Sequence, residues 1–459
     1  MPDLTISAEL LRRYDRPGPR YTSYPTAVEF HTDHTAADHA ERLQGVEPGT
    51  SLSLYVHIPF CERRCLYCAC NVVATRKREV VDRYLSYLER EMELLAAYLP
   101  APAATVQLHL GGGTPTCLSP AQLHQVHRMV TRRFPLRPDA EVAVEVDPRV
   151  TTREHVDRLA ALGFNRLSLG VQDLTPEVQE AIGRHQDESD TRELFHYCRK
   201  QGFGSINLDL IYGLPGQNTV TFARNLAAVI DLRPDRIALY SYAHVPWVKA
   251  HQKRIDTSLL PQGMAKLELF AQGIQAFREA GYRQIGMDHF ALPEDELSRA
   301  LAERRLHRNF MGYTVHRTPA MVGAGITAIS DVCGAYAQNR KKLTAYYHDL
   351  DAGLLPVERG IGLSRDDLIR RHVITQLMCN GVLHCEDVEH RFGIGFNQYF
   401  ARELAELRSG PCADGLLQLA PGIIEATPLG HLFIRNIAMV FDCYLRRKDT
   451  GQPAFSRTV

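Results

Sequence analysis

The sequence predicts an α/β protein: a partial, TIM-like (β/α)6 barrel, preceded by an N-terminal arm and followed by a mainly helical C-terminal domain. Short β-type runs alternate with amphipathic helical stretches between about residues 50 and 285, and the alternation stops after about residue 360. Polar or glycine-rich residues follow nearly every run. Strand and helix repetition of this kind is typical of a parallel sheet with helices packed outside it.

Six runs are rich in aliphatic and β-branched residues and have the length of strands. They cover residues 51–58, 105–110, 141–146, 165–170, 205–211 and 235–241. The stretches between them place apolar residues three and four positions apart, as amphipathic helices do; the clearest are 79–99, 121–134, 154–163 and 222–232. Six clear units favour an incomplete barrel over a full eight-unit barrel.

The length of the chain predicts more than one domain. A single hydrophobic core usually stops growing at about 250 to 300 residues, and this chain has 459. We expect an N-terminal arm (1–48), the barrel with a substrate-side extension (49–355) and a helical, winged-helix-like C-terminal domain (360–459) containing a hairpin at 415–427. Residues 364–459 hold 11 Lys or Arg and 11 Asp or Glu, a balance that favours a structural or lid role over DNA binding.

Charge and hydropathy exclude two classes of partner. Lys plus Arg and Asp plus Glu number 53 each, so we expect no nucleic acid. The N-terminus carries charges every few residues and lacks the apolar core of a signal peptide. No later stretch reaches the roughly 18 uninterrupted apolar residues of a membrane span. We therefore expect a cytoplasmic protein without membrane insertion.

Four of the eleven cysteines lie within ten residues. Cys61, Cys65 and Cys68 have the spacing C-x3-C-x2-C, and three thiolates on one short loop can each bind one iron of a 4Fe-4S cluster and leave the fourth iron open. Cys70 supplies a fourth thiol, so a zinc site is the alternative. Structural zinc usually draws its ligands from two separated pairs, and a cluster is therefore favoured.

The unusual residues of the barrel fall where catalytic groups are expected. In parallel β/α barrels the site lies at the C-terminal ends of the strands, on the loops that lead into the helices. The following residues occupy these positions, in chain order: the cysteine loop, glycines 111–113, Glu145 and Asp147, Gln172, Asp209 and His244.

The cysteine loop is part of a pattern that resembles a known family. CERRCLYC (61–68) resembles the C-x3-C-x-aromatic-C signature of the radical S-adenosylmethionine (SAM) superfamily. The chain as a whole resembles the oxygen-independent coproporphyrinogen III oxidases, or dehydrogenases, within it. The motifs are RYTSYPTA (20–27), LYVHIPFC (54–61), a further C-x-C ending at Cys70, GGGTPT (111–116), VEVDPR (144–149), LSLGVQD (167–173), LDLIYGLPGQ (208–217), YAHVP (242–246), GMDHFA (286–291) and HRNFMGYT (307–314).

The resemblance implies an oxidoreductase of porphyrin and haem biosynthesis. Such enzymes decarboxylate two propionate side chains of coproporphyrinogen III to vinyl groups, giving protoporphyrinogen IX, by way of a 5′-deoxyadenosyl radical made from SAM at a 4Fe-4S cluster. It implies a tetrapyrrole substrate, a low-potential electron donor such as a flavodoxin or ferredoxin, and a monomer. Two alternatives remain: a haem-binding or haem-chaperone relative, and a radical SAM enzyme acting on another substrate.

The resemblance also assigns site residues. The cluster-bound SAM would contact Tyr55, Gly112, Glu145 and Ile329. A second SAM would contact Tyr67, Gly113, Thr114, Gln172, Arg184, Asp209 and Ala243. Tyr55 and Cys70 are the catalytic candidates, with Cys70 near the second SAM or the substrate, and Arg20 and Tyr21 are candidates to meet substrate carboxylates.

Elementary chemistry supports several of these assignments. Glycine allows backbone to approach a ligand closely, and a strand-end carboxylate can accept hydrogen bonds from ribose hydroxyls. Arg184 can form a bidentate pair with a SAM carboxylate, the alternative being a surface ion pair. Ala69 and Leu110 depart from the residues common in relatives, glycine and an aromatic residue, so activity or exact substrate could differ.

Overall fold

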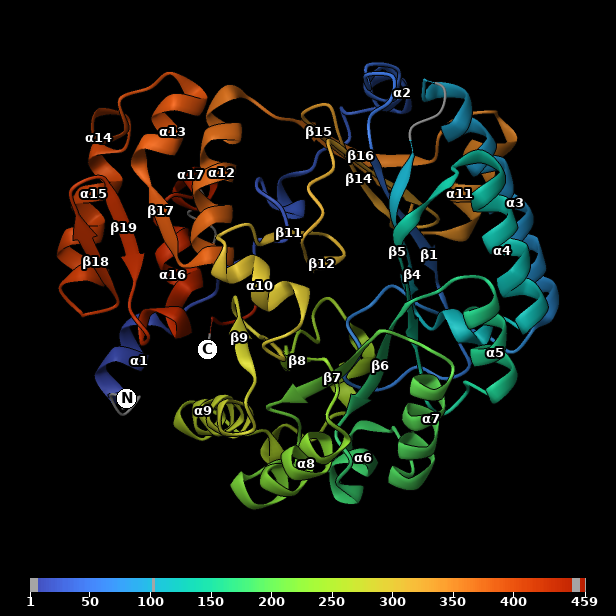
Figure 1. Ribbon diagram of the computed structural model, residues 1–459, viewed down its shortest axis with the longest axis horizontal. Helices are drawn as coiled ribbons and strands as arrows, with labels where there is room; N and C mark the ends of the chain where they lie inside the picture. Colours follow the sequence, from blue (N-terminus) through green and yellow to red (C-terminus); the bar gives the residue numbers. More distant parts are fainter. Residues whose placement is uncertain (1–6, 101–103, 448–454, 459) are drawn as a thin grey trace.

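A sheet of twelve strands organises the molecule. The computed structural model describes residues 7–100, 104–447 and 455–458, and Figure 1 shows the curved sheet with helices along its outer side. In spatial order the strands are β16 (Val357–Gly362), β15 (Ala335–Asn339), β14 (Ile329–Val332), β13 (Ala320–Ala324), β1 (Leu52–Ile58), β4 (Thr105–Gly112), β5 (Leu136–Val146), β6 (Arg166–Gln172), β7 (Ser205–Tyr212), β8 (Arg236–Ser241), β10 (His289–Ala291) and β9 (Arg283–Ile285).

The six predicted strands are β1 and β4 to β8, and they pair in parallel in that order. The prediction of a partial six-unit barrel is therefore confirmed. β13 adds a seventh parallel strand beside β1, and short antiparallel strands extend the sheet at both ends. Because β16 and β9 are the two outermost strands, the sheet does not close, and the eight-unit alternative is wrong.

The helices α3 to α9 cover the outer face of the barrel. They are α3 (Arg78–Tyr98), α4 (Pro120–Arg133), α5 (Arg153–Ala161), α6 (Pro176–Ile182), α7 (Glu188–Lys200), α8 (Thr219–Leu232) and α9 (Met264–Glu279). Local sequence sets where several begin: Ser119 and Asn218 form capping boxes at the starts of α4 and α8. β1 and β7 are buried or half-buried along their whole length, whereas β6 alternates between buried and half-buried residues.

Residues 280–362 form the extension. The helices there are α10 (Glu296–Ala302) and α11 (Leu343–Asp351), and the hairpin β11 (His307–Asn309) to β12 (Gly312–Thr314) lies apart from the main sheet. Thr314 of the hairpin accepts a hydrogen bond from Gln107 of β4 (3.2 Å). The hairpin is thus attached to the barrel through a side chain that points inward from β4.

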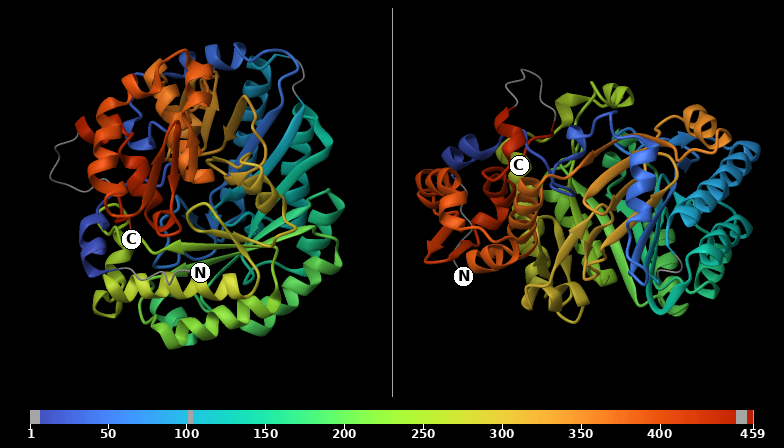
Figure 2. Two further views of the ribbon diagram at one scale, coloured as in Figure 1. Left: turned by 60° about the vertical axis from the view of Figure 1, so that its left-hand side comes forward. Right: turned by 90° about the horizontal axis from the view of Figure 1, so that it is seen from above.

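The C-terminal region has its own hydrophobic core and lies to one side of the barrel (Figure 2). The predicted hairpin is present as β18 and β19, and a third strand, β17, joins it. Its elements are α12 (Arg365–Asn380), β17 (Val382–His384), α13 (Cys385–Phe392), α14 (Phe396–Tyr399), α15 (Ala401–Leu407), a π-helix (Arg408–Cys412), β18 (Leu417–Ala420), β19 (Ile423–Ala426), a 3-10 helix (Gly430–Phe433), α16 (Ile434–Met439) and α17 (Cys443–Arg447).

The N-terminal arm is packed against the C-terminal region. It contains α1 (Ala8–Tyr14) and α2 (Ala36–Gln44). The Tyr14 hydroxyl donates to Asp414 (2.6 Å), and the Arg435 guanidinium donates to the Pro19 carbonyl (3.1 Å). These contacts join the N-terminal arm to the C-terminal region. In the part of the chain that the structure describes, no helix combines the length and apolar character needed to cross a membrane.

Candidate active site

The cysteine loop leaves the C-terminal end of β1 and is held by its backbone. A short parallel pair, β2 (Phe60–Cys61) and β3 (Val73–Ala74), closes the loop on itself. The N–H groups of Val73 and Thr75 donate to the carbonyls of Pro59 (2.8 Å) and Cys61 (3.0 Å). These bonds fix the ends of the loop and leave the thiols free for other partners.

Each of the three predicted ligand thiols has a polar neighbour. Cys61 Sγ lies 3.3 Å from Thr114 Oγ1, on the turn after β4. Cys65 is buried, and its Sγ accepts N–H groups from Arg149 (3.6 Å) and Arg184 (3.8 Å). The Cys70 thiol bonds to Cys68, and this bond lowers the pKa of Cys68 and raises that of Cys70. Burial raises the pKa of Cys61 to about 11, although its contact with Thr114 acts in the opposite direction. Positive charge and hydrogen bonds favour thiolates, the form that binds metal.

Arg184 belongs to a buried ionic network beside Cys65. It is 4% exposed, and its two terminal nitrogens donate to Asp147 over 3.0 and 3.1 Å. Arg149 adds a second pair to the same carboxylate (2.6 Å). Burial alone raises the pKa of Asp147, but Arg184 and Arg149 outweigh it and lower the pKa to about 2. The surface ion pair considered for Arg184 is therefore wrong, and its bidentate fork is taken by Asp147.

A second group gathers around Glu145 at the end of β5. Its two oxygens accept hydrogen bonds from His109 Nε2 (3.2 Å) and from the Gly112 N–H (3.1 Å). Burial raises the pKa of Glu145, but these bonds outweigh it and lower the pKa below its ordinary value. The Tyr55 ring stacks on His109 with ring centres 5.9 Å apart. Tyr55, Gly112 and Glu145 thus lie close together, and their contact with SAM stays a prediction.

Ile329 reaches this group through the neighbouring strands. Gly323 of β13 pairs with Tyr55 of β1. A Cβ atom on Gly323 would lie 2.6 Å from the Ile329 carbonyl oxygen, so β14 approaches β13 too closely for any side chain there. The four residues assigned to the cluster-bound SAM therefore lie on β14, β1, β4 and β5, with β13 between β14 and β1.

The glycine turn after β4 packs tightly against the end of β1. A Cβ on Gly112 would lie 2.8 Å from the Ile58 carbonyl oxygen, and Gly112 has a φ of +122°. A Cβ on Gly113 would come within 2.7 Å of the Phe60 carbonyl oxygen. Close contact between this turn and the start of the cysteine loop is therefore what excludes side chains. The Thr114 N–H completes the junction by donating to the Phe60 carbonyl (2.8 Å).

The interior of the barrel is polar. Asp209 accepts hydrogen bonds from Ser168 (2.9 Å) and Asn207 (2.8 Å). Burial, reinforced by the negative charge of Glu145, raises the pKa of Asp209 to about 6. Both carboxylates line a cavity of about 140 Å³ that the β11–β12 hairpin also borders. Gln172, in the left-handed region with φ +67°, ends β6 beside the Arg184 network.

The loop after β8 binds the cysteine loop from the other side. Gln252 Nε2 donates to the carbonyls of both Tyr67 (2.9 Å) and Ala243 (3.2 Å). His251 Nε2 lies 2.8 Å from the Cys68 carbonyl, and Lys249 donates to the Cys70 carbonyl (3.2 Å). Tyr67 and Ala243, both assigned to a second SAM, are therefore held by one side chain.

The structure separates the two substrate candidates of the arm. Arg20 donates to Asp288 (3.2 Å) and to the Ser241 carbonyl (3.1 Å) at the C-terminal end of β8. Tyr21 is buried, with its hydroxyl donating to Asp442 (2.9 Å) of the C-terminal region. Arg20 thus faces the catalytic end of the barrel, whereas the Tyr21 hydroxyl is committed to a structural contact.

Four polar residues of the site were not singled out from the sequence. They are His109, Arg149, Gln252 and Lys266, whose ammonium group donates to the Tyr242 carbonyl just after β8 (3.1 Å). Arg149 stands inside the motif VEVDPR, and His109 precedes the motif GGGTPT by two residues, so closeness to a motif was the available signal. Gln252 and Lys266 lie in a loop and on α9, and no spacing rule connects them to the cysteines.

The donor set fits an iron–sulfur cluster. Three thiols lie on one loop, two arginines donate to Cys65, and Arg184 Nε is a buried donor without a partner among the described residues. A cluster bound by thiolates offers sulfur acceptors for such donors. Among the described residues, no three or more His, Cys, Asp or Glu side chains form a group that could hold a single metal ion.

Comparisons with known proteins agree with this site. Residues 55–227 match the Radical SAM superfamily and residues 363–433 match the HemN C-terminal domain. Two relatives, from Synechocystis sp. and Salmonella typhimurium, are 43% and 45% identical over 100% and 98% of this chain and 99% and 98% of their own lengths. Both are named oxygen-independent coproporphyrinogen III oxidase. The solved coproporphyrinogen III oxidase (HemN) of Escherichia coli, described as a radical SAM enzyme, has a TM-score of 0.89 and 44% identity over 92% of this chain and 97% of its own.

The barrel and its cysteine loop define a radical SAM oxidoreductase, whose cofactors are a 4Fe-4S cluster and SAM. The predicted cluster is confirmed in preference to zinc. Within this class, the chain belongs to the family of oxygen-independent coproporphyrinogen III oxidases.

Proposed function

We propose that this protein converts coproporphyrinogen III to protoporphyrinogen IX by oxidative decarboxylation of two propionate side chains, in haem biosynthesis and without oxygen. The observation that carries the proposal is the thiol loop at the catalytic end of the barrel, with Cys65 beside Arg149 and Arg184. When bound, the cluster and SAM supply a 5′-deoxyadenosyl radical that can take a hydrogen atom from a propionate. The residues described above hold and shield the reactants.

Cys61, Cys65 and Cys68 are the proposed iron ligands. Two arginines donate toward Cys65, so their positive charge offsets the negative charge of thiolates. Cys70 lies outside this set: its thiol bonds to Cys68, and it is exposed. We assign Cys70 to the substrate side, as a catalytic residue together with Tyr55.

Two SAM positions are part of the proposal. Tyr55, Gly112, Glu145 and Ile329 would line the first, and Glu145 would accept ribose hydroxyls in place of its present partners. Tyr67, Gly113, Thr114, Gln172, Arg184, Asp209 and Ala243 would line the second. Gln252 supports this grouping because it bonds to the backbones of both Tyr67 and Ala243. A second SAM fits the loss of a hydrogen atom from each of two propionates.

Arg20 and Lys266 are the proposed receptors for substrate carboxylates. They donate to successive carbonyls at the end of β8, Ser241 and Tyr242, each over 3.1 Å. Asp288 pairs with Arg20, whereas Lys266 forms no ion pair with any carboxylate of the described residues. Burial, with the charge of Arg20 next, lowers the pKa of Lys266 to about 8. A substrate carboxylate would supply the missing counter-charge.

The remaining elements of the proposal concern context. The electron donor would be a low-potential flavodoxin or ferredoxin, the protein would act as a monomer in the cytoplasm, and its domains would divide near residues 48 and 355–360. The division is supported by the separate hydrophobic cores of the barrel and of the C-terminal region.

The direct test is an anaerobic assay with reductant, SAM and coproporphyrinogen III. We expect the monovinyl and then the divinyl product in chromatography, with methionine and 5′-deoxyadenosine formed alongside. Protein that binds haem but forms neither vinyl product would contradict the proposal and favour a haem-chaperone role. A product heavier than the substrate would indicate group transfer instead.

A further inference from the structure

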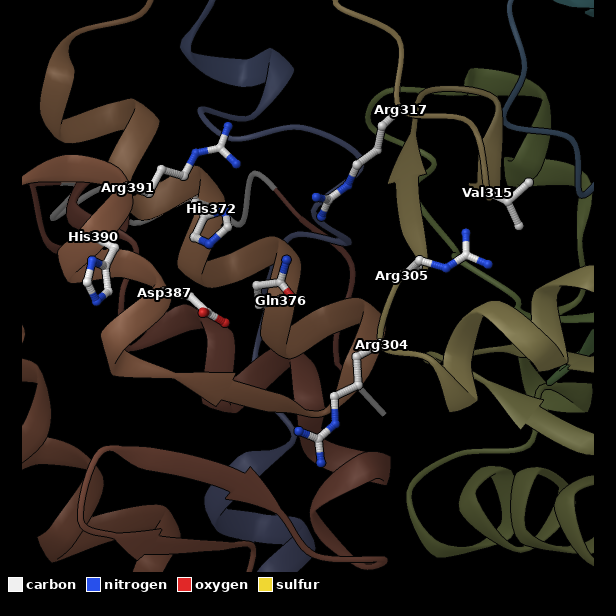
Figure 3. A pocket seen from close by; sticks show the side chains of 9 residues that line it. All are labelled: Arg304, Arg305, Val315, Arg317, His372, Gln376, Asp387, His390 and Arg391. Carbon is white, nitrogen blue, oxygen red and sulfur yellow. The ribbon is translucent and has the colours of Figure 1, made fainter.

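A basic hollow lies between the C-terminal region and the extension of the barrel. Its volume is about 730 Å³. Figure 3 shows its side chains arriving from separate elements. Arg304 and Arg305 follow α10, Arg317 follows β12, His372 is on α12, and His390 and Arg391 are on α13.

The positive charge of this hollow is poorly compensated. Four arginines line it against one carboxylate, that of Asp387. Arg305 pairs with the nearby Glu303, but neither Arg317 nor Arg391 forms an ion pair with a carboxylate anywhere in the described residues. Burial, followed by the charge of Arg391, lowers the pKa of Arg317. Arginines that share a hollow without counter-ions repel one another and attract anions.

His372 adds a hydrogen-bonding group to the same hollow. Its Nε2 is buried and has no partner among the described residues. Burial, with Arg391 and Arg317 as the next causes, lowers the pKa of His372 to about 4. The imidazole is therefore neutral at pH 7, and Nε2 can donate or accept a hydrogen bond with a bound group, depending on the tautomer. Buried polar atoms are rarely left without a partner.

The hollow is distinct from the active site. Just after Arg317, the Thr318 hydroxyl donates to Ser53 at the start of β1 (2.9 Å). The cysteine loop leaves the opposite, C-terminal end of the same strand. Arg317 therefore lies toward the edge of the sheet that is opposite to the thiols.

We propose that this hollow binds a small polyanion carrying at least two phosphate or carboxylate groups. Its volume falls within the roughly 300 to 1,000 Å³ usual for ligand sites. Guanidinium groups bind phosphate and carboxylate in a bidentate manner, and separate arginines on opposing walls suit a ligand with separated charges. A concave site favours a small molecule over an extended surface.

The test is isothermal titration of the intact holoenzyme with two probes, inorganic pyrophosphate and coproporphyrin III, which carries four carboxylates. The pocket variant is Arg317→Gln with Arg391→Gln. The control is Arg128→Gln with Arg224→Gln, which removes the same charge from two exposed arginines on α4 and α8. We expect at least a 10-fold loss of affinity for one probe in the pocket variant and none in the control.

The two probes distinguish the source of the anion. Binding of pyrophosphate that the pocket variant loses indicates a phosphate ligand. If the wild type binds coproporphyrin III at two sites and the pocket variant binds it at one, the hollow takes a carboxylate ligand. The site that remains in the pocket variant is then the catalytic site. Vinyl product formation should be unchanged in the pocket variant, so a failure of this proposal is separable from a failure of the proposed reaction.

Two results overturn the proposal. One is a wild type that binds neither probe beyond the catalytic site, and the other is an equal loss of affinity in the pocket and control variants. If the double substitution prevents folding, the single change Arg305→Gln at an exposed position replaces it. Unchanged binding in that variant, for a probe that the wild type binds, overturns the proposal equally.

Discussion

Replacing Asp147 with asparagine tests the ionic network beside the cluster ligands. Asp147 accepts both terminal nitrogens of Arg184 and one of Arg149, and all three side chains are mostly buried. The change keeps the shape of the side chain but leaves two guanidinium groups without their carboxylate. Arg184 would keep the Gly170 carbonyl and the Gln186 side chain as acceptors, and both guanidinium groups would keep the thiol of Cys65.

The pKa of Asp147 gives the size of the effect. Folding lowers it from 3.8 to about 2, and each pKa unit corresponds to about 1.4 kcal/mol, so the ionised form contributes about 2 kcal/mol to stability. Breaking a buried pair by removing one partner costs about 3 to 5 kcal/mol. We therefore expect Asp147→Asn to lower the free energy of unfolding by about 2 to 5 kcal/mol at pH 7.

The sign of the pH dependence follows from the lowered pKa. The contribution is fully present above the unfolded value of 3.8 and is lost as the pH falls through about 2. The difference between wild type and variant should thus stay constant from pH 7 to pH 5 and shrink below pH 4.

The assay is urea unfolding of the cluster-free protein, kept anaerobic and reduced, followed by circular dichroism from pH 7 to pH 3. Asp139→Asn is the matched control, because Asp139 lies on β5, the strand that leads to Asp147, and pairs with Arg137 at the surface. We expect no measurable change there. Equal stability of wild type and Asp147→Asn at pH 7 would refute the reasoning, and so would a difference that does not depend on pH.

Three further predictions concern the ligands, a buried acid and the substrate. Cys65→Ala should abolish the cluster absorbance and lower the iron content. Cys70→Ala should keep the cluster and lose turnover. Full cluster absorbance in Cys65→Ala would contradict the ligand assignment. Burial raises the pKa of Glu91 from 4.5 to about 7. The stability of the wild type therefore falls by about 3 kcal/mol as the pH rises through this interval. Urea unfolding of Glu91→Gln between pH 5 and 8 should not show this decrease. Lys266→Gln should raise the KM for coproporphyrinogen III about 10-fold with a smaller change in kcat. The control Lys253→Gln, at an exposed position, should leave KM and kcat unchanged. Equal effects of these two substitutions would show that Lys266 does not belong to the substrate site.

The periodicity of the sequence was sufficient to predict the six parallel strands, because their runs are rich in aliphatic and β-branched residues and alternate with helical stretches. The same signal failed for shorter or more polar strands. β13 is only five residues long, Ala320–Ala324, and contains a glycine. β5 begins at Leu136 instead of 141, since its first residues are exposed and charged. These strands form because a neighbouring strand pairs with them.

Sequence reasoning predicted the position of the candidate site better than it predicted the contacts within the site. The cysteine spacing and the strand-end positions were enough to bring Cys61, Glu145 and Asp209 to one end of the barrel. The contact between Arg184 and Asp147 joins residues 37 positions apart, and no pattern in the chain encodes that distance. Tyr21 is a second example, because its hydroxyl contacts Asp442, 421 positions away.

The loop after β8 explains how three thiols on a surface loop can stay in place and still bind iron. Gln252, His251 and Lys249 contact the backbone carbonyls of Tyr67, Cys68 and Cys70. All three contacts hold the cysteine loop through its backbone, so none of them uses a thiol. A binding site whose supporting contacts avoid the ligand atoms is preorganised for its metal. The loops after the first and sixth parallel strands therefore act as one unit, and a change in Gln252 should disturb the cluster although Gln252 contacts no thiol.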